Sequence, residues 1–206
     1  MDAAEATAAN NGNGFPQPAF GEVKAGDIKY RDINGDGIIN TRDEVYLGRG
    51  GWFGAPLTLG LNLSAKWKNF TFFALGTGRF GAKAMKNNSY FWVDGQDKYS
   101  AVVRDRWTEQ TKNTATFPRL TTQNSDNNFR NSDFWLFSAN QFNLQKVQIS
   151  YSLPSKILNG KLLKELGLYV AGFNLLTVAK EQELMEMNIG RAPQTRLYNF
   201  GIKGAF

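Results

Sequence analysis

The sequence predicts an all-β fold, an antiparallel transmembrane β-barrel fragment of about five strands in an open curved sheet with long extracellular loops. Three observations predict it. Stretches of about ten residues alternate between apolar and polar side chains. Very short and very long connections join these stretches. Aromatic residues gather near the strand ends, and Phe206 ends the last alternating stretch.

The clearest strand follows Pro56 and runs to Trp67, with an apolar face and a small polar face. The Lys68-Asn69 dipeptide then predicts a tight hairpin into a second β-rich run, Phe70 to Thr77, whose alternation is poorer. The apolar positions of the first strand are Leu57, Leu59, Leu61, Leu63, Ala65 and Trp67, and the polar ones are Thr58, Gly60, Asn62, Ser64 and Lys66.

Three more strands are predicted toward the C-terminus. The first begins at Gln141 and ends at Pro154, which lacks the N–H that a sheet ladder needs. The second covers Gly167 to Leu176 and the third Arg196 to Phe206, with Tyr198, Phe200, Ile202 and Phe206 on one side. Short helical turns are expected near Ala101 to Gln110 and within Lys156 to Leu166.

These strands define the expected organisation. Residues 1–25 lack periodicity and are predicted to be a flexible lead-in. Residues 26–55 are predicted to form an extracellular loop with a calcium-loop motif. Residues 56–206 are expected to hold the barrel strands, with long loops at about 79–140 and 177–195.

Composition excludes several functions. The 206 residues contain no His and no Cys, so nucleophile systems built on His, zinc fingers and iron–sulfur sites are excluded. The net charge of +6 comes from scattered Lys and Arg without a basic cluster, which argues against nucleic-acid binding. We therefore expect no enzyme. Asp126 and Asp133 resemble a glycosidase pair only by residue type.

Sidedness follows from the strand directions. If Phe206 lies at the periplasmic face, Lys68-Asn69 and the Pro154 linker are periplasmic and the long connections are extracellular. Trp67, Phe70, Tyr151 and Phe206 then form an aromatic girdle at that interface, unless they are ordinary core aromatics. Five strands do not close a barrel, and Met1 to Phe15 show no secretory signal, so we expect the chain to be the C-terminal part of a larger protein.

One motif carries metal chemistry. The segment DINGDGIINTRD fits the calcium-loop pattern D-x-[DN]-x-[DN]-G with an acid at position twelve. Hard oxygens are the ligands that Ca²⁺ prefers, and Gly37 permits the sharp turn. The alternative is an Asn-Gly and Asp-Gly turn without an ion. The predicted ligands are Asp32, Asn34, Asp36, Ile38 through its carbonyl, Asn40 and Asp43.

Other side chains are weaker candidates. The loop aromatics Trp92, Trp107, Trp135, Phe91 and Phe134 are equally suited to stacking on sugar rings and to local packing. Lys66, Lys146 and Lys203 lie on polar strand faces, where they line a lumen or are simply solvated.

Five segments together resemble one family. They are GDIKYRDINGDGIINTRDEVYLG, PLTLGLNLSAKWKNFTFF, VQISYSLP, GLYVAGFNLLT with its Asn174-Leu175 pair, and the closing YNFGIKGAF, in this order over nearly all of Gly26 to Phe206. This series is similar to the SusC/RagA-type TonB-linked outer-membrane proteins of Bacteroidetes.

The resemblance implies a large barrel with an N-terminal plug that imports glycans or peptides across the outer membrane. It implies a SusD-like surface lipoprotein as partner, the TonB complex as energy source through the missing N-terminal part, and the barrel-assembly machinery acting on the strand that ends at Phe206. The competing hypothesis is a soluble secreted β-sandwich that binds ligands and carries a dockerin-like calcium site.

Overall fold

The computed structural model describes residues 1–50, 54–93, 95, 100–122, 127–158, 163–189 and 191–205. The chain divides into two compact units, which we describe separately. The sheet unit comprises Arg49–Ala84 and Ser138–Phe206, and the loop unit comprises Met1–Gly48 and Met85–Phe137. Asp126 and Phe206 themselves lie outside the described residues.

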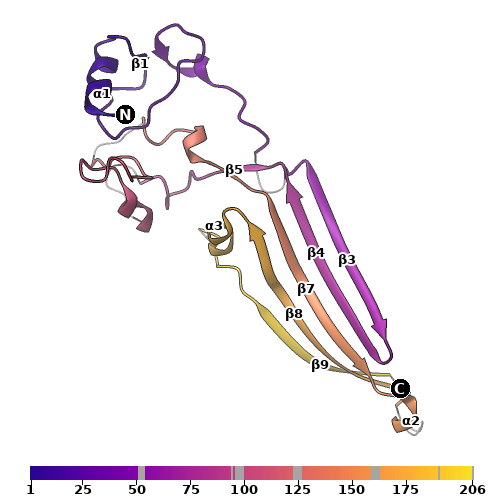
Figure 1. Cartoon of the computed structure of the whole chain (residues 1–206). Coiled ribbons are helices and arrows are strands. Elements are labelled where there is room, and N and C mark those ends of the chain that lie inside the picture. The colour runs from indigo at the N-terminus through magenta and orange to yellow at the C-terminus, as the bar shows by residue number, and fades with distance from the viewer. Residues whose placement is uncertain are drawn as a thin grey trace. The chain divides into compact units, whose positions relative to one another are not determined.

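Five long strands lie side by side in one curved antiparallel sheet (Figure 1). They are β3 (Leu57–Trp67), β4 (Phe70–Phe80), β7 (Gln141–Ser152), β8 (Glu165–Ala179) and β9 (Leu197–Ala205), in the order β3-β4-β7-β8-β9. The outer strands β3 and β9 do not pair with each other in the described chain, so the sheet is open. The predicted fold class is confirmed.

The connections separate by length between the two ends of the sheet. At one end Lys68 and Asn69 turn β3 into β4, with Lys68 at a φ of 52°, and α2 (Ser155–Leu158) lies between β7 and β8. Asn69 joins these connections, since its amide Nδ2 donates to the Ser152 carbonyl at 2.8 Å. The longer connections, including α3 (Gln182–Met187), leave from the opposite end. The expected alternation of short and long connections is present.

A β-bulge interrupts β7 and β8 near their middle. The register shifts between Leu144 and Lys146, and Asn174 on β8 adopts a φ of 53°. Its side-chain amide donates to the Thr195 carbonyl at 3.2 Å. Asn tolerates the left-handed region better than most residues, which gives the Asn174-Leu175 pair of the sequence a structural reason.

The loop unit contains short elements. They are α1 (Ala3–Asn10), a two-residue parallel pair of β1 (Gln17–Pro18) and β2 (Ile38–Ile39), and the 3₁₀ turns η1 (Thr41–Asp43), η2 (Ala101–Asp105) and η3 (Asp133–Trp135). β5 (Lys83–Met85) and β6 (Leu136–Ser138) form a separate two-stranded pair. No helix in the described part of the chain is long and apolar enough to span a membrane.

The N-terminal segment differs from the expected flexible lead-in. It forms α1, which Asp2 and Glu5 close with reciprocal side-chain to backbone hydrogen bonds of 2.8 and 3.1 Å. The helix was missed because it has no amphipathic periodicity, whereas its Ala-rich sequence favours helix and Asp2 caps it. Ala6 and Ala9 are buried beside Val23. This segment is therefore packed into the loop unit.

The long loops expected at residues 26–55 and 79–140 also contribute packed structure. Asp27 and Asn128 are both buried, and the Asn128 amide donates to an Asp27 carboxylate oxygen at 2.8 Å. The backbone N–H of Ile28 in turn donates to the Asn128 side chain at 2.9 Å. Segments about a hundred positions apart are thus joined by buried polar contacts, which no local sequence pattern indicates.

Candidate functional site

One face of the sheet is apolar from edge to edge, and we call it the apolar face. The cross-strand partners Leu63, Ala74, Val147 and Gly172 form one row of it, in register across four strands. None of its side chains in the described strands is charged. Its larger members are Leu57, Leu59, Leu61, Trp67, Phe70, Phe72, Phe80, Phe142, Leu144, Ile149, Tyr151, Leu166, Leu168, Val170, Leu176, Val178, Tyr198, Phe200 and Ile202.

Most of these side chains are exposed, whereas Phe80, Phe142, Leu144, Tyr151 and Leu166 are half-buried. Leu59 is 52% exposed, Ile149 46% and Phe200 82%. A contiguous exposed apolar area of this extent marks an interaction with a membrane or another protein. A two-sheet sandwich would bury such a face between its sheets, so the single open sheet is evidence against the sandwich hypothesis.

The opposite face carries the charged and amide side chains, and we call it the polar face. Lys66, Lys146 and Lys203 all lie on it, as the sequence predicted. Phe73 of β4 and Phe173 of β8 also lie on the polar face. Phe73 is one reason why apolar and polar residues alternate less regularly in the sequence of β4. An apolar outer face and a polar inner face are the pattern of a transmembrane β-barrel wall.

Aromatic side chains meet at the end of the sheet that carries the short turns. Trp67 and Phe70 stack with centroids 6.4 Å apart, and the Phe70 and Tyr151 rings lie 4.8 Å apart. Lys68 lies over the Trp67 ring at 4.8 Å. The structure thus brings together the three described members of the predicted girdle.

The calcium-loop residues lie in one exposed loop whose side chains bind their own backbone. Asp32 accepts hydrogen bonds from the N–H groups of Gly35 and Gly37 at 2.6 and 2.8 Å. Asn34 and Asp36 each accept from the N–H two positions later. These are the Asx turns that Asn and Asp form in loops.

Asp43 closes this loop. Its carboxylate accepts from the backbone of Ile33 at 2.8 Å and of Asn40 at 2.8 Å. These backbone hydrogen bonds lower the pKa of Asp43 below its ordinary range. The donor set is all oxygen, which suits Ca²⁺, but no three acidic side chains in the described residues gather closely enough to hold a metal ion.

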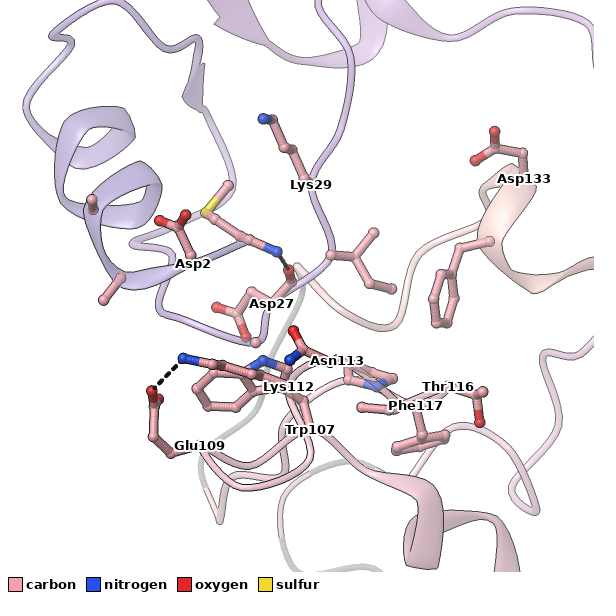
Figure 2. Close-up of a pocket in the computed structure, with 18 residues that line it drawn as sticks. Asp2, Asp27, Lys29, Trp107, Glu109, Lys112, Asn113, Thr116, Phe117 and Asp133 are labelled. Atoms are coloured by element: carbon pink, nitrogen blue, oxygen red, sulfur yellow. Dashed lines mark hydrogen bonds and ion pairs between the residues drawn. The ribbon is translucent and has the colours of Figure 1, made fainter.

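Two pockets lie within the loop unit. The first, of about 900 Å³, is lined by the start of α1 and by residues of two loops (Figure 2). Trp107, Phe117 and Phe134 line it, beside the Glu109–Lys112 ion pair at 3.3 Å. The second, of about 830 Å³, is lined by Trp92 and by parts of the calcium loop.

The loop aromatics therefore divide into two groups. Trp135 and Phe91 are buried, 3% and 8% exposed, and pack in the interior of the loop unit. Trp107 and Phe134 line the first pocket, with Phe134 44% exposed. Trp92 belongs with this second group, since it lines the second pocket. The second group is placed to contact a ligand, together with Asn113 and Thr116 of the first pocket, which sequence reasoning missed because nothing in their local pattern distinguishes them.

An open antiparallel sheet with one apolar and one polar face is the wall of an outer-membrane β-barrel. Known proteins with similar sequences are of the same class. The chain is 30% identical over 156 residues to TonB-dependent receptor P26 of Formosa agariphila, covering 73% of this chain and 15% of that protein. It is 24% identical over 169 residues to TonB-dependent receptor P3 of the same organism, covering 81% and 16%. No protein-family model matches the chain.

Solved structures give the same result. The RagAB peptide transporter matches with a TM-score of 0.55 and 25% identity, over 71% of this chain and 17% of that one. The RagAB peptide importer in its closed-closed state matches equally, over 72% and 17%. The chain is part of a TonB-dependent receptor of the SusC/RagA type and belongs to the outer membrane. It spans about a sixth of the length of these relatives.

Proposed function

We propose that this chain supplies barrel wall and extracellular loops to a TonB-dependent importer of glycans or peptides. The observation that carries the proposal is the exposed, uncharged apolar face that continues across all five strands above a polar face. The apolar face lies against lipid and the polar face lines the lumen. The chain itself catalyses no reaction, and the relatives it matches are receptors and transporters.

The orientation is part of the proposal. The end with the Lys68-Asn69 turn and α2 is periplasmic, because short turns lie on that side of such barrels. Trp67, Phe70 and Tyr151 then lie at the membrane interface, where aromatic side chains are enriched. The loop unit is extracellular, and its pocket with Trp107 and Phe134 contacts the glycan or peptide.

The partners follow from the same assignment. A SusD-like surface lipoprotein pairs with the extracellular side, and the TonB complex acts through parts of the full-length protein that this chain does not span. The barrel-assembly machinery recognises strand β9, with its aromatic Tyr198 and Phe200.

Detergent dependence tests this proposal. We expect the purified chain to aggregate in buffer and to become monodisperse, with β-rich circular dichroism, once a nonionic detergent covers the apolar face. Sedimentation velocity with and without detergent distinguishes these states. A monodisperse chain with cooperative thermal unfolding in detergent-free buffer would contradict the membrane assignment.

We also propose that the loop from Asp32 to Asp43 binds a structural Ca²⁺ ion. Asp32, Asn34, Asp36, Asn40 and Asp43 would supply side-chain oxygens, and Ile38 its carbonyl. The support is chemical, since each residue offers oxygen and the Asx turns already fold the loop upon itself. When bound, the ion would offset the repulsion among the three carboxylates and rigidify an extracellular loop.

Calorimetric titration of the chain in detergent with Ca²⁺ tests the site. We expect binding in the range of extracellular calcium modules, with a Kd of about 0.1–1 mM. Asp36→Ala should abolish the heat, whereas Asp105→Ala, which removes an acid elsewhere in the same unit, should not change it. No heat from the unaltered chain at millimolar Ca²⁺ would leave the loop as an ion-free Asx turn.

A further inference from the structure

Charge is divided unevenly between the two units. The sheet unit contains 13 Lys and Arg against four Asp and Glu, a net charge of +9. The loop unit contains 11 against 14, a net charge of −3. The excess positive charge of the chain, +6 in total, therefore resides in the unit that carries the membrane-spanning sheet.

Within the sheet, the strand charges share one face. Lys66, Arg79, Lys146 and Lys203 lie on the polar face, where the one acid of the strands, Glu165, stands at the first position of β8. The apolar face beneath them carries no charge. A surface of one sign backed by a low-dielectric wall concentrates counter-ions in front of it. The polar face is thus an electropositive strip.

Lys146 occupies a fixed place on this strip. Its Nζ lies 5.6 Å from the ring centroid of Phe73 on β4 and 5.4 Å from that of Phe173 on β8. Two rings on the neighbouring strands thus hold the ammonium group between them, as cation–π contacts do. No carboxylate in the described residues forms an ion pair with Lys146, so its charge is available to a solute.

The neutral polar side chains elsewhere on this face both donate and accept hydrogen bonds. Amides and hydroxyls match the hydroxyl groups of a sugar, which have the same double capacity. An acidic peptide would also be attracted by the charge, but its backbone presents far fewer hydroxyl groups. The neutral polar members of the face that are not buried include Thr58, Asn62, Ser64, Thr71, Thr77, Asn143, Gln148, Ser150 and Asn199.

We propose that the polar face of the sheet binds carboxylate-bearing glycans, uronate oligomers being the simplest of them, with Lys146 as a specificity-determining residue. This inference rests on the proposed function, because it requires the polar face to line a solute path. Lys146 contacts a carboxylate of the glycan, while Lys66 and Lys203 raise its local concentration along the strip. A neutral glycan of the same backbone binds more weakly because it gains only the hydrogen bonds.

The test compares matched probes on the full 206-residue chain, folded in an uncharged polyoxyethylene detergent. The probes are a galacturonate hexamer, its methyl ester, which lacks the charge, and hexaglutamate. Binding is followed by the anisotropy of a labelled oligomer. We expect the acid to bind about ten-fold more tightly than its ester, and the difference to shrink when salt is raised from about 50 to about 500 mM.

Two variants test whether Lys146 is responsible for the tighter binding of the acidic oligomer. Lys146→Gln should weaken binding of the galacturonate hexamer about five-fold and leave the ester almost unchanged. Lys156→Gln removes the same charge from α2, outside the sheet, and should change both by less than about two-fold. Lys203→Gln on the edge strand β9 serves as a second variant if the substitution within β7 impairs folding, which circular dichroism in detergent reveals.

Equal affinity for the acid and its ester, or equal effects of Lys146→Gln and Lys156→Gln, would overturn the inference while the importer proposal stands. Hexaglutamate binding as tightly as the galacturonate would overturn the choice of a glycan. Absence of binding to every oligomer by a chain that folds in detergent would overturn it as well. A chain that folds without detergent instead refutes the importer proposal itself.

Discussion

Asp27 and Arg119 form a buried ion pair, with Nε of the arginine 2.5 Å from Oδ1 of the aspartate, although 92 positions separate them in the chain. The Asp27 side chain is 1% exposed and that of Arg119 21%. Asn128, which is fully buried, donates to the same carboxylate oxygen at 2.8 Å. This group joins three separate segments of the loop unit.

Removing the negative charge should therefore destabilise the loop unit. Asp27→Asn leaves the guanidinium without its counter-charge in a site with little water, and we expect a loss of about 3 kcal/mol in the free energy of unfolding. Urea denaturation followed by tryptophan fluorescence measures it, because Trp92, Trp107 and Trp135 all lie in this unit.

An exposed pair in the same unit provides the control. Glu5 and Lys29 form an ion pair of 2.7 Å whose side chains are 28% and 46% exposed. Glu5→Gln keeps a side chain that can close the capping box of α1, so it should cost less than about 1 kcal/mol. Equal losses for Asp27→Asn and Glu5→Gln would show that burial of the first pair has no energetic consequence.

An arginine introduced into β3 should have opposite consequences for folding on the two faces of the strand. Leu61 lies on the apolar face and its neighbour Asn62 on the polar face, both near the middle of the strand. Leu61→Arg should cost about 2–4 kcal/mol of folding in lipid vesicles, because it places a guanidinium in hydrocarbon. Asn62→Arg faces water and should cost little.

The measurement is urea titration in phosphatidylcholine vesicles, with the folded fraction read from heat-modifiable migration on gels. Each variant carries the same added charge on the same strand, so general effects of charge cancel in the comparison. If Asn62→Arg were as damaging as Leu61→Arg, the assignment of the two faces to lipid and lumen would be wrong.

The strands could be predicted from the sequence where apolar and polar side chains alternate with a period of two. The strand predicted from Leu57 to Trp67 has those limits in the structure, because each apolar residue there lies on the same face. The strand predicted to end at Thr77 continues to Phe80, since Gly76 and Gly78 carry no side chain to mark the alternation. The short Lys68-Asn69 turn also accounts for the pairing of β3 with β4.

The loop unit could not be predicted in the same way. Its contacts join residues such as Ile28 and Asn128 through single polar side chains, which leave no periodic trace. The aromatic pocket residue Trp107 packs over Gly26, which adopts a φ of +86° and has no room for a Cβ atom. Such a contact depends on the path of the whole chain, and neither residue alone indicates it.

Ionisation of Tyr30 should make the stability of the loop unit fall at high pH. Its hydroxyl donates to the Asn127 carbonyl at 2.5 Å, and burial raises its pKa to about 12. The folded state therefore holds the phenol proton more tightly than the unfolded state, whose tyrosine titrates near 10. The corresponding stabilisation is complete below about pH 10 and is lost as the pH rises toward 12.

Spectrophotometric titration and urea denaturation between about pH 9 and 12 check this dependence. We expect one tyrosine to ionise late and the free energy of unfolding to fall over the same range. Tyr30→Phe should abolish the late step, reduce the loss of stability at high pH, and cost about 1 kcal/mol at neutral pH through its missing hydrogen bond. A late step that persists in Tyr30→Phe would assign the raised pKa to another tyrosine.

The bulge at Asn174 offers a test that separates backbone strain from hydrogen bonding. Asn174→Ala and Asn174→Gly both remove the bond to the Thr195 carbonyl, so the difference between them reports the φ of 53° alone. Alanine pays the steric penalty of the left-handed region and glycine does not, and we expect the alanine variant to be less stable by about 1 kcal/mol in detergent. If the alanine variant proved as stable as the glycine variant, the backbone at this position would not be left-handed, and the register shift of β7 and β8 would need another explanation.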